Sequence, residues 1–267
     1  MNHETSVMKS QIEIISIKLR RQNLLIRYVL LLLFFIIIGI KSVSQSIEIK
    51  KNIYLIPGQG ADERLFKNLK FDTSRFEIHY IKYRIPYKGE DMESYAVRLS
   101  NQIDTTKEFC LIGVSLGGMI ATEINEILKP KKVIIISGAK CRNELPARYR
   151  FQKSIPIYKI VPKQLIKQSS FIAQPLFEPD RKKEKETCVL MLKDKDPTFL
   201  KRTIEMIINW DRKSFDSNIV HIHGNNDHTL PVKNIKYNYL INNGSHMMIL
   251  TQTPEINNII LSVISDM

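Results

Sequence analysis

The stretch FCLIGVSLG at residues 109–117 decides the fold. Its first four residues form an apolar run typical of a buried strand, and a helical pattern follows over residues 116–128. Between them, Gly113, Ser115 and Gly117 form the motif G-x-S-x-G, in which a sharp strand-to-helix turn holds the central serine in a strained backbone conformation. Side chains two positions either side would collide with the adjoining strand and helix, which explains the glycines. The stretch therefore predicts that the serine projects at the carboxyl end of a sheet.

Short apolar, β-branched runs alternate with longer helical patterns along most of the chain after residue 45. This alternation is typical of a parallel sheet covered by helices, so we predict an α/β fold with a mostly parallel central sheet flanked by helices. The predicted strands cover residues 53–56, 76–83, 109–113, 133–137, 219–223 and 237–241. The predicted helices cover about residues 61–69, 91–103, 116–128 and 254–265.

The alternation stops after the fourth predicted strand, in a stretch rich in proline and in short amphipathic segments. Within it, Asp196 and Pro197 precede a helical pattern, as expected for an N-cap followed by proline at the first helical position. We therefore predict a helical cap, residues 140–217, inserted into an α/β core formed by residues 45–139 and 218–267.

A serine hydroxyl is a weak nucleophile unless a base lies within hydrogen-bond reach and an acid orients that base. Asp227 stands in the loop after the predicted strand 219–223, and His246 stands in the turn between the last predicted strand and the last helix. Each residue thus follows a strand of the same sheet. The sequence predicts that Ser115, Asp227 and His246 meet as a catalytic triad.

With these residues the chain resembles the α/β-hydrolase superfamily, in its serine esterase and lipase-like branch with a helical cap, over about residues 50–267. The resemblance implies cleavage of a carboxylic ester or thioester of a small molecule through an acyl-enzyme intermediate, with no metal or organic cofactor. An acyltransferase or other triad chemistry on the same fold is an alternative. A catalytically inactive, membrane-tethered binding protein is another. Nothing in the sequence indicates an oligomeric state.

The resemblance also assigns an oxyanion hole. Family members carry a glycine-rich loop after the first strand, and Gly58, Gln59 and Gly60 stand at that place here. Pro57 occupies a position where many members have histidine. By resemblance, the backbone N–H groups of Gln59 and Leu116 are the oxyanion donors. A plain tight turn before a helix is the simpler alternative for this loop.

Among four further polar residues, one is an alternative to these assignments. Glu144 could replace Asp227 as the acid, because some family members place the acid after the preceding strand. His221 and His223 lie inside an apolar strand, where packed or hydrogen-bonded histidines are expected rather than metal ligands. His228 is in the wrong loop for the base, so we expect it to support the site from behind.

The net charge of +13 is concentrated in two segments. Residues 140–217 hold eighteen basic and ten acidic side chains, whereas the predicted core is almost neutral. Such a segment attracts anionic surfaces, so docking of the cap on lipid is one hypothesis, and a solvated lysine-rich face is the simpler one. Nucleic-acid binding is not indicated, because neither zinc-ligand spacing nor an RNA-binding aromatic motif accompanies the charge.

The N-terminal segment, residues 1–44, combines basic residues with an apolar stretch over residues 24–40. The uninterrupted apolar run, residues 28–40, is short for a membrane-spanning helix and suits a signal peptide. Small residues at 42 and 44 offer a cleavage site before Gln45. We predict a cleaved signal peptide or a transmembrane signal anchor, and in both cases an extracytoplasmic catalytic domain.

Overall fold

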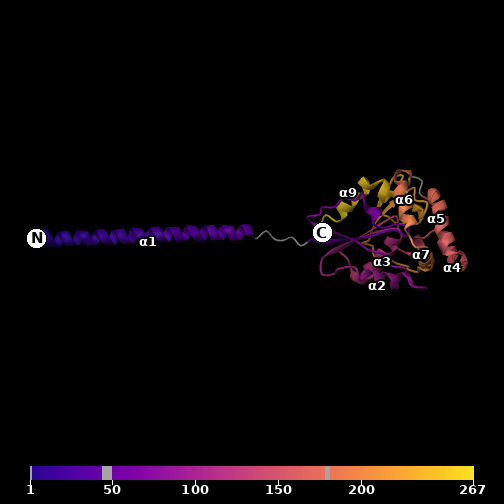
Figure 1. Cartoon of the computed structure of the whole chain (residues 1–267), viewed down its shortest axis with the longest axis horizontal. Helices are drawn as coiled ribbons and strands as arrows, with labels where there is room; N and C mark the ends of the chain where they lie inside the picture. The colour runs from indigo at the N-terminus through magenta and orange to yellow at the C-terminus, as the bar shows by residue number, and fades with distance from the viewer. Residues whose placement is uncertain (1, 44–49, 178–180) are drawn as a thin grey trace. The chain divides into compact units, whose positions relative to one another are not determined.

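The computed structural model describes residues 2–43, 50–177 and 181–267 (Figure 1). The chain divides into two compact units, Met1–Glu48 and Ile49–Met267. In the first unit, helix α1 runs over Asn2–Val43, so it includes the basic residues as well as the predicted apolar stretch. Within the described residues, none of the helices meets the criteria of length and apolar content for crossing a membrane. The predicted cleavage site extends to residues 44 and 45, outside the described residues, and export stays a prediction.

The second unit is built on a six-stranded sheet in the order β2-β1-β3-β4-β5-β6. Every neighbouring pair of strands in this sheet is parallel, which confirms the α/β prediction. The strands are β1 (Lys51–Ile56), β2 (Phe76–Tyr80), β3 (Phe109–Val114), β4 (Lys132–Ile136), β5 (Val220–Gly224) and β6 (Tyr239–Ile241). Because all strands point the same way, the loops that follow them gather at one edge.

Two helical layers cover the sheet, and alternate residues of each central strand face one layer or the other. Helices α2 (Met92–Ser100) and α3 (Leu116–Leu128) pack on one face, while α8 (Met248–Thr251) and α9 (Thr253–Val263) pack on the opposite face (Figure 1). In β3, Leu111 joins the first layer, whereas Ile112 joins the second. Burial on both faces explains why this strand is a continuous apolar run.

Several predicted elements are shorter in the structure than the sequence suggested, and two of them lie between β1 and the end of β2. The predicted helix over residues 61–69 is the 3-10 turn η1 (Glu63–Phe66), because its backbone bonds join residues three apart, as in Leu65 N–H to the Asp62 carbonyl. The predicted strand over residues 76–83 ends at Tyr80, which pairs with Leu55 near the end of β1. Because β1 ends at Ile56, β2 has almost no strand partner beyond Tyr80.

Between β4 and β5 the chain forms η2 (Arg142–Glu144), α4 (Ala147–Ser154), η3 (Ile157–Lys159), α5 (Lys163–Phe177), η4 (Arg181–Glu184), α6 (Lys185–Lys193) and α7 (Pro197–Asn209). We call α4 to α7 the cap helices. As predicted, the Asp196 carboxylate caps α7 by accepting the N–H groups of Thr198 and Phe199, with Pro197 at the first position.

The two ends of this insertion are tied together. The Arg142 N–H donates to the Arg212 carbonyl at 2.8 Å, and the Arg142 guanidinium donates to the Trp210 carbonyl at 2.7 Å. Both Arg212 and Trp210 also donate to the carboxylate of Glu123 in α3. We call this group the stem of the cap.

Candidate active site

Ser115 lies in the turn between β3 and α3, with φ 54° and ψ −116°. A positive φ is unfavourable for a residue with a side chain, so the surrounding structure must hold it. Its N–H donates to the Ile136 carbonyl of β4 at 3.0 Å, and its carbonyl accepts the N–H groups of Gly118 and Met119 in the first turn of α3. The strained turn is therefore fixed on both sides by backbone hydrogen bonds.

The glycines of the G-x-S-x-G motif are required by backbone contacts. A Cβ at Gly113 would overlap the backbone of Gly117, and a Cβ at Gly117 would overlap the carbonyl oxygen of Ile56 at the end of β1. The clash at Gly117 is therefore with β1, whereas the sequence led us to expect clashes only with the strand and helix on either side of the turn. Gly60, by contrast, has room, since a Cβ there would make only an ordinary 3.5 Å contact with Leu192.

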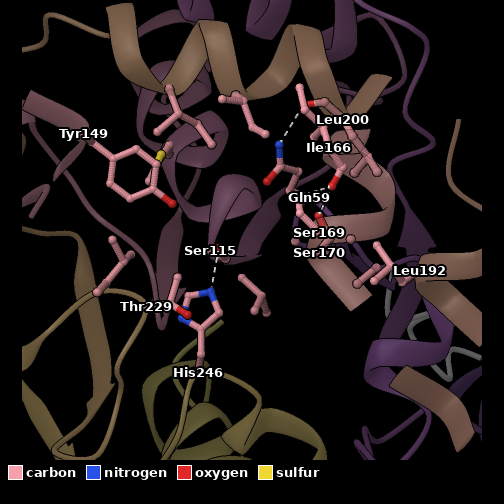
Figure 2. Close-up of a pocket in the computed structure, with 18 of the residues that line it drawn as sticks. Gln59, Ser115, Tyr149, Ile166, Ser169, Ser170, Leu192, Leu200, Thr229 and His246 are labelled. Atoms are coloured by element: carbon pink, nitrogen blue, oxygen red, sulfur yellow. Dashed lines mark hydrogen bonds between the residues drawn. The ribbon is translucent and has the colours of Figure 1, made fainter. Parts of the chain in front are cut away.

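The structure brings the three predicted triad side chains together, and Figure 2 shows the contact between His246 and Ser115. His246 Nε2 lies 2.9 Å from Ser115 Oγ, and His246 Nδ1 lies 2.8 Å from Asp227 Oδ2. An ionised carboxylate only accepts hydrogen bonds, so Nδ1 carries the proton and Nε2 is left as the acceptor for the serine hydroxyl. This is the tautomer that a general base needs.

The Asp227 carboxylate is buried and fully engaged. Its Oδ1 accepts the backbone N–H groups of Thr229 at 2.8 Å and Leu230 at 2.7 Å, while Oδ2 faces His246. Burial alone would raise the pKa of this carboxyl, but the charge and hydrogen bond of His246 hold the pKa below its ordinary value. The carboxylate therefore stays ionised and keeps the imidazole oriented.

A pair of glycines that the sequence analysis did not single out brings the acid and the base together. Gly224 ends β5 and Gly244 stands in the turn after β6, and a Cβ at Gly224 would overlap the Gly244 backbone. The Asn226 N–H donates to the Gly244 carbonyl at 3.0 Å. The only signal in the sequence was a glycine in the loop after each of two strands.

The loop after β1 is a tight turn, in which the Ala61 N–H donates to the Gly58 carbonyl at 3.1 Å, and it also borders the nucleophile and the cap. Gly58 lies close to the serine, since a Cβ there would stand 3.4 Å from Ser115 Cβ. The side chain of Gln59 reaches the cap, donating to the Leu200 carbonyl at 3.1 Å (Figure 2) and to the Thr203 hydroxyl at 2.7 Å. Leu116 is the first residue of α3, where backbone N–H groups lack partners within the helix.

At Pro57, which replaces the histidine of many family members, the carbonyl accepts a hydrogen bond of 2.5 Å from the Tyr83 hydroxyl. The chain after β2 therefore holds this loop in place. Tyr83 was predicted as a strand residue, and its position beyond the end of β2 is what lets its hydroxyl reach the loop.

The alternatives for the acid and for the supporting histidines have clear outcomes. Glu144 is buried, and its carboxylate accepts the N–H groups of Lys140 at 2.7 Å and Lys236 at 3.1 Å, so it serves the backbone while Asp227 contacts His246. His228 Nε2 lies 3.0 Å from Asn226 Oδ1 in an exposed contact, so the structure does not bear out a place for its ring behind the triad.

A cavity of about 550 Å³ opens above Ser115 between the core and the cap helices (Figure 2). Its lining is largely apolar and aromatic, and the polar members besides Ser115 and His246 are Gln59, Arg148, Gln152, Ser169, Ser170 and Thr229. Apolar and aromatic members include Met119, Tyr149, Ile157, Tyr158, Val161, Ile166, Leu192, Leu200, Ile204, Ile207, Leu230 and Met247. Sequence reasoning placed the cap over the site but could not say which cap side chains face the cavity.

The parallel sheet, the strained serine turn and the Ser-His-Asp hydrogen bonds together define an α/β-hydrolase fold. The sequence pattern of the Uncharacterised protein family UPF0227 matches residues 67–206. The chain belongs to this family.

Solved structures with the same fold are distant in sequence. A thermophilic esterase is 15% identical with a TM-score of 0.57, covering 80% of this chain and 89% of its own. An esterase from Exiguobacterium antarcticum is 16% identical with a TM-score of 0.58, covering 79% and 91%. A putative non-heme bromoperoxidase from Mycobacterium tuberculosis is 13% identical with a TM-score of 0.60, covering 82% and 93%. A comparison with curated proteins finds no match.

Proposed function

We propose that this protein is a serine hydrolase that cleaves carboxylic esters or thioesters of small molecules. The observation that carries the proposal is the unbroken hydrogen-bond chain from Ser115 Oγ through His246 to Asp227, with Ser115 and His246 lining a partly open, largely apolar cavity. Two of the similar structures are esterases by name. An intact chain of this kind is not needed by a binding protein without turnover, which disfavours that alternative.

In the proposed reaction, Ser115 Oγ attacks the acyl carbon while His246 Nε2 takes the hydroxyl proton. The same imidazole then returns that proton to the leaving alcohol or thiol, which departs and leaves an acyl-enzyme. Water repeats the sequence and releases the carboxylic acid. Asp227 stays ionised throughout and stabilises the imidazolium form of the base.

The negative charge that develops on the acyl oxygen requires donors beside the nucleophile. We assign this role to the backbone N–H groups of Gln59 and Leu116, which flank Ser115 from the β1 loop and from the first turn of α3. Loss of one such donor typically costs about 3 kcal/mol of transition-state stabilisation. The N-terminal end of α3 adds a favourable dipole at the same place.

The test is hydrolysis of p-nitrophenyl esters of graded acyl length, together with labelling by a fluorophosphonate probe. The wild-type protein is expected to hydrolyse at least one ester and to be labelled, whereas Ser115→Ala loses both by a factor on the order of 10⁴ or more. Ser262→Ala, an exposed serine of α9, is the matched control and should keep both. Hydrolysis that survives in Ser115→Ala would contradict the proposal.

A further inference from the structure

Three buried polar side chains that the proposed reaction does not use lie behind the triad. His223 and His221 project from the same face of β5 and are 0% exposed, and Lys140, which follows β4, is 2% exposed. Burying ionisable groups without solvent is costly unless each finds a partner. The partners they have form one line that leads to the loop of Asp227.

The donor and acceptor of each hydrogen bond in this line can be assigned by starting from the Leu230 carbonyl, the end nearest the triad. His223 Nε2 lies 2.8 Å from the Leu230 carbonyl, which only accepts, so Nε2 carries the proton. Burial lowers the pKa of both His223 and His221, so both rings are neutral and His223 Nδ1 is an acceptor. His221 Nε2, 3.3 Å away, therefore donates to His223.

His221 Nδ1 must then accept, and the Lys140 ammonium group stands 3.2 Å from it. The same ammonium group donates to the Lys236 carbonyl and lies 3.5 Å from Glu144 Oε1. Burial lowers the pKa of Lys140, and the Glu144 carboxylate opposes that change. The line is thus satisfied from end to end, with one hydrogen-bond direction throughout.

Near the triad, the N–H of His223 meets two groups. Besides the Leu230 carbonyl, its Nε2 lies 3.6 Å from Asp227 Oδ2, the oxygen that orients His246. The Leu230 N–H in turn donates to Asp227 Oδ1. The histidine therefore holds Leu230, the residue whose N–H donates to one oxygen of the acid, and presents its own positive N–H dipole to the other oxygen.

We propose that His223 is a positioning residue for the acid of the triad, held in its neutral Nε2–H form by His221 and Lys140. It fixes the loop between Gly224 and Leu230 so that the Asp227 carboxylate stays directed at His246. This inference rests on the proposed function, because it assigns a role within the same site. It adds a residue to the site that the G-x-S-x-G, Asp and His pattern does not include.

The test compares His223→Phe, which keeps the ring and removes the donor, with His223→Gln, which restores an N–H near the Nε2 position. The first variant is expected to lower kcat roughly 10- to 100-fold with little change in KM, because a buried carbonyl loses its partner and the acid loses its support. The second should recover kcat to within a few-fold of wild type. Ile222→Val alters the opposite face of the same strand and controls for general destabilisation.

Nuclear magnetic resonance supplies readouts that need no turnover. The wild-type spectrum should show His223 neutral with its proton on Nε2, and a downfield resonance for the His246 Nδ1 proton that broadens or disappears in His223→Phe. A wild-type kcat in His223→Phe, or a proton on His223 Nδ1, would overturn the inference. If the wild-type protein neither hydrolyses esters nor reacts with the probe, the proposed function fails, while these spectra still decide the role of His223.

Discussion

The sheet edge and the cap enclose the same cavity but are held in very different ways. At the sheet edge, Asp227 and His246 are 3% and 7% exposed, and backbone hydrogen bonds fix each loop. In the cap, α4 has no buried residue, and Ile160 and Ile172 are 82% and 77% exposed. The difference teaches that the chemistry is set by a rigid frame, the loops that carry Ser115, Asp227 and His246, whereas the cap is lightly packed at α4 and tightly packed only at helices such as α7, which buries six residues.

Asp227→Asn should have the largest effect, because the Asp227 carboxylate accepts hydrogen bonds from His246 and from two backbone N–H groups. An amide in place of the carboxylate favours the wrong tautomer of His246, and a loss of about 10⁴-fold in kcat is expected with little change in fold. Steady-state kinetics and circular dichroism measure the two quantities. If the variant retained most of its kcat, the acid would have to be another residue.

Gly117→Ala should have the next largest effect, on stability. The added methyl group meets the Ile56 carbonyl oxygen, which cannot move without displacing β1, so a loss of about 3 kcal/mol in the free energy of unfolding is expected. Gly60→Ala is the matched variant and should change stability by less than about 1 kcal/mol, since its nearest neighbour is a flexible leucine. Urea denaturation compares them, and equal losses would show that the frame is not more tightly packed than its surroundings.

Ile166→Ala should have the smallest effect on chemistry and act on selectivity. This cap residue lines the cavity and is 6% exposed, so its truncation enlarges the acyl site. A shift in relative kcat/KM toward longer esters of about tenfold is expected, with kcat for the best substrate nearly unchanged. Ile160→Ser, on the exposed side of the cap, should leave the chain-length profile as it is. A large loss of kcat for all esters in Ile166→Ala would mean that the cap is part of the frame.

The frame was also the part that the sequence could predict. Ser115, Asp227 and His246 each follow a strand, and parallel strands bring their carboxyl ends to one edge, so local patterns were enough to bring them together. The need for glycine at 113 and 117 was also predicted locally, because side chains there would collide with the adjoining strand and helix. The strained conformation of Ser115 was predicted as well. Only the structure could show that the group next to Gly117 is the Ile56 carbonyl of β1.

The rest depends on contacts between segments far apart in the chain, which no local pattern specifies. The bridge from Gln59 to Thr203, the close approach of Gly224 and Gly244, and the line from Lys140 to His223 are of this kind. The predicted helix over residues 61–69 failed for a related reason. Its apolar residues suited a helix, but Leu65 and Phe66 are buried from a single 3-10 turn capped by Asp62.

The stem of the cap has a consequence for how this chain can be altered. Arg142 and Arg212 bring the two ends of the insertion to nearly one point on α3, so the sheet does not depend on the helices between them for its connectivity. An exchange of residues 146–209 as a unit would therefore need a new partner for Gln59 and for the core surface that α7 covers, but no new chain connection. A grafted cap of another size, joined at the same two arginines, would change which molecules enter the cavity while leaving the catalytic triad in place.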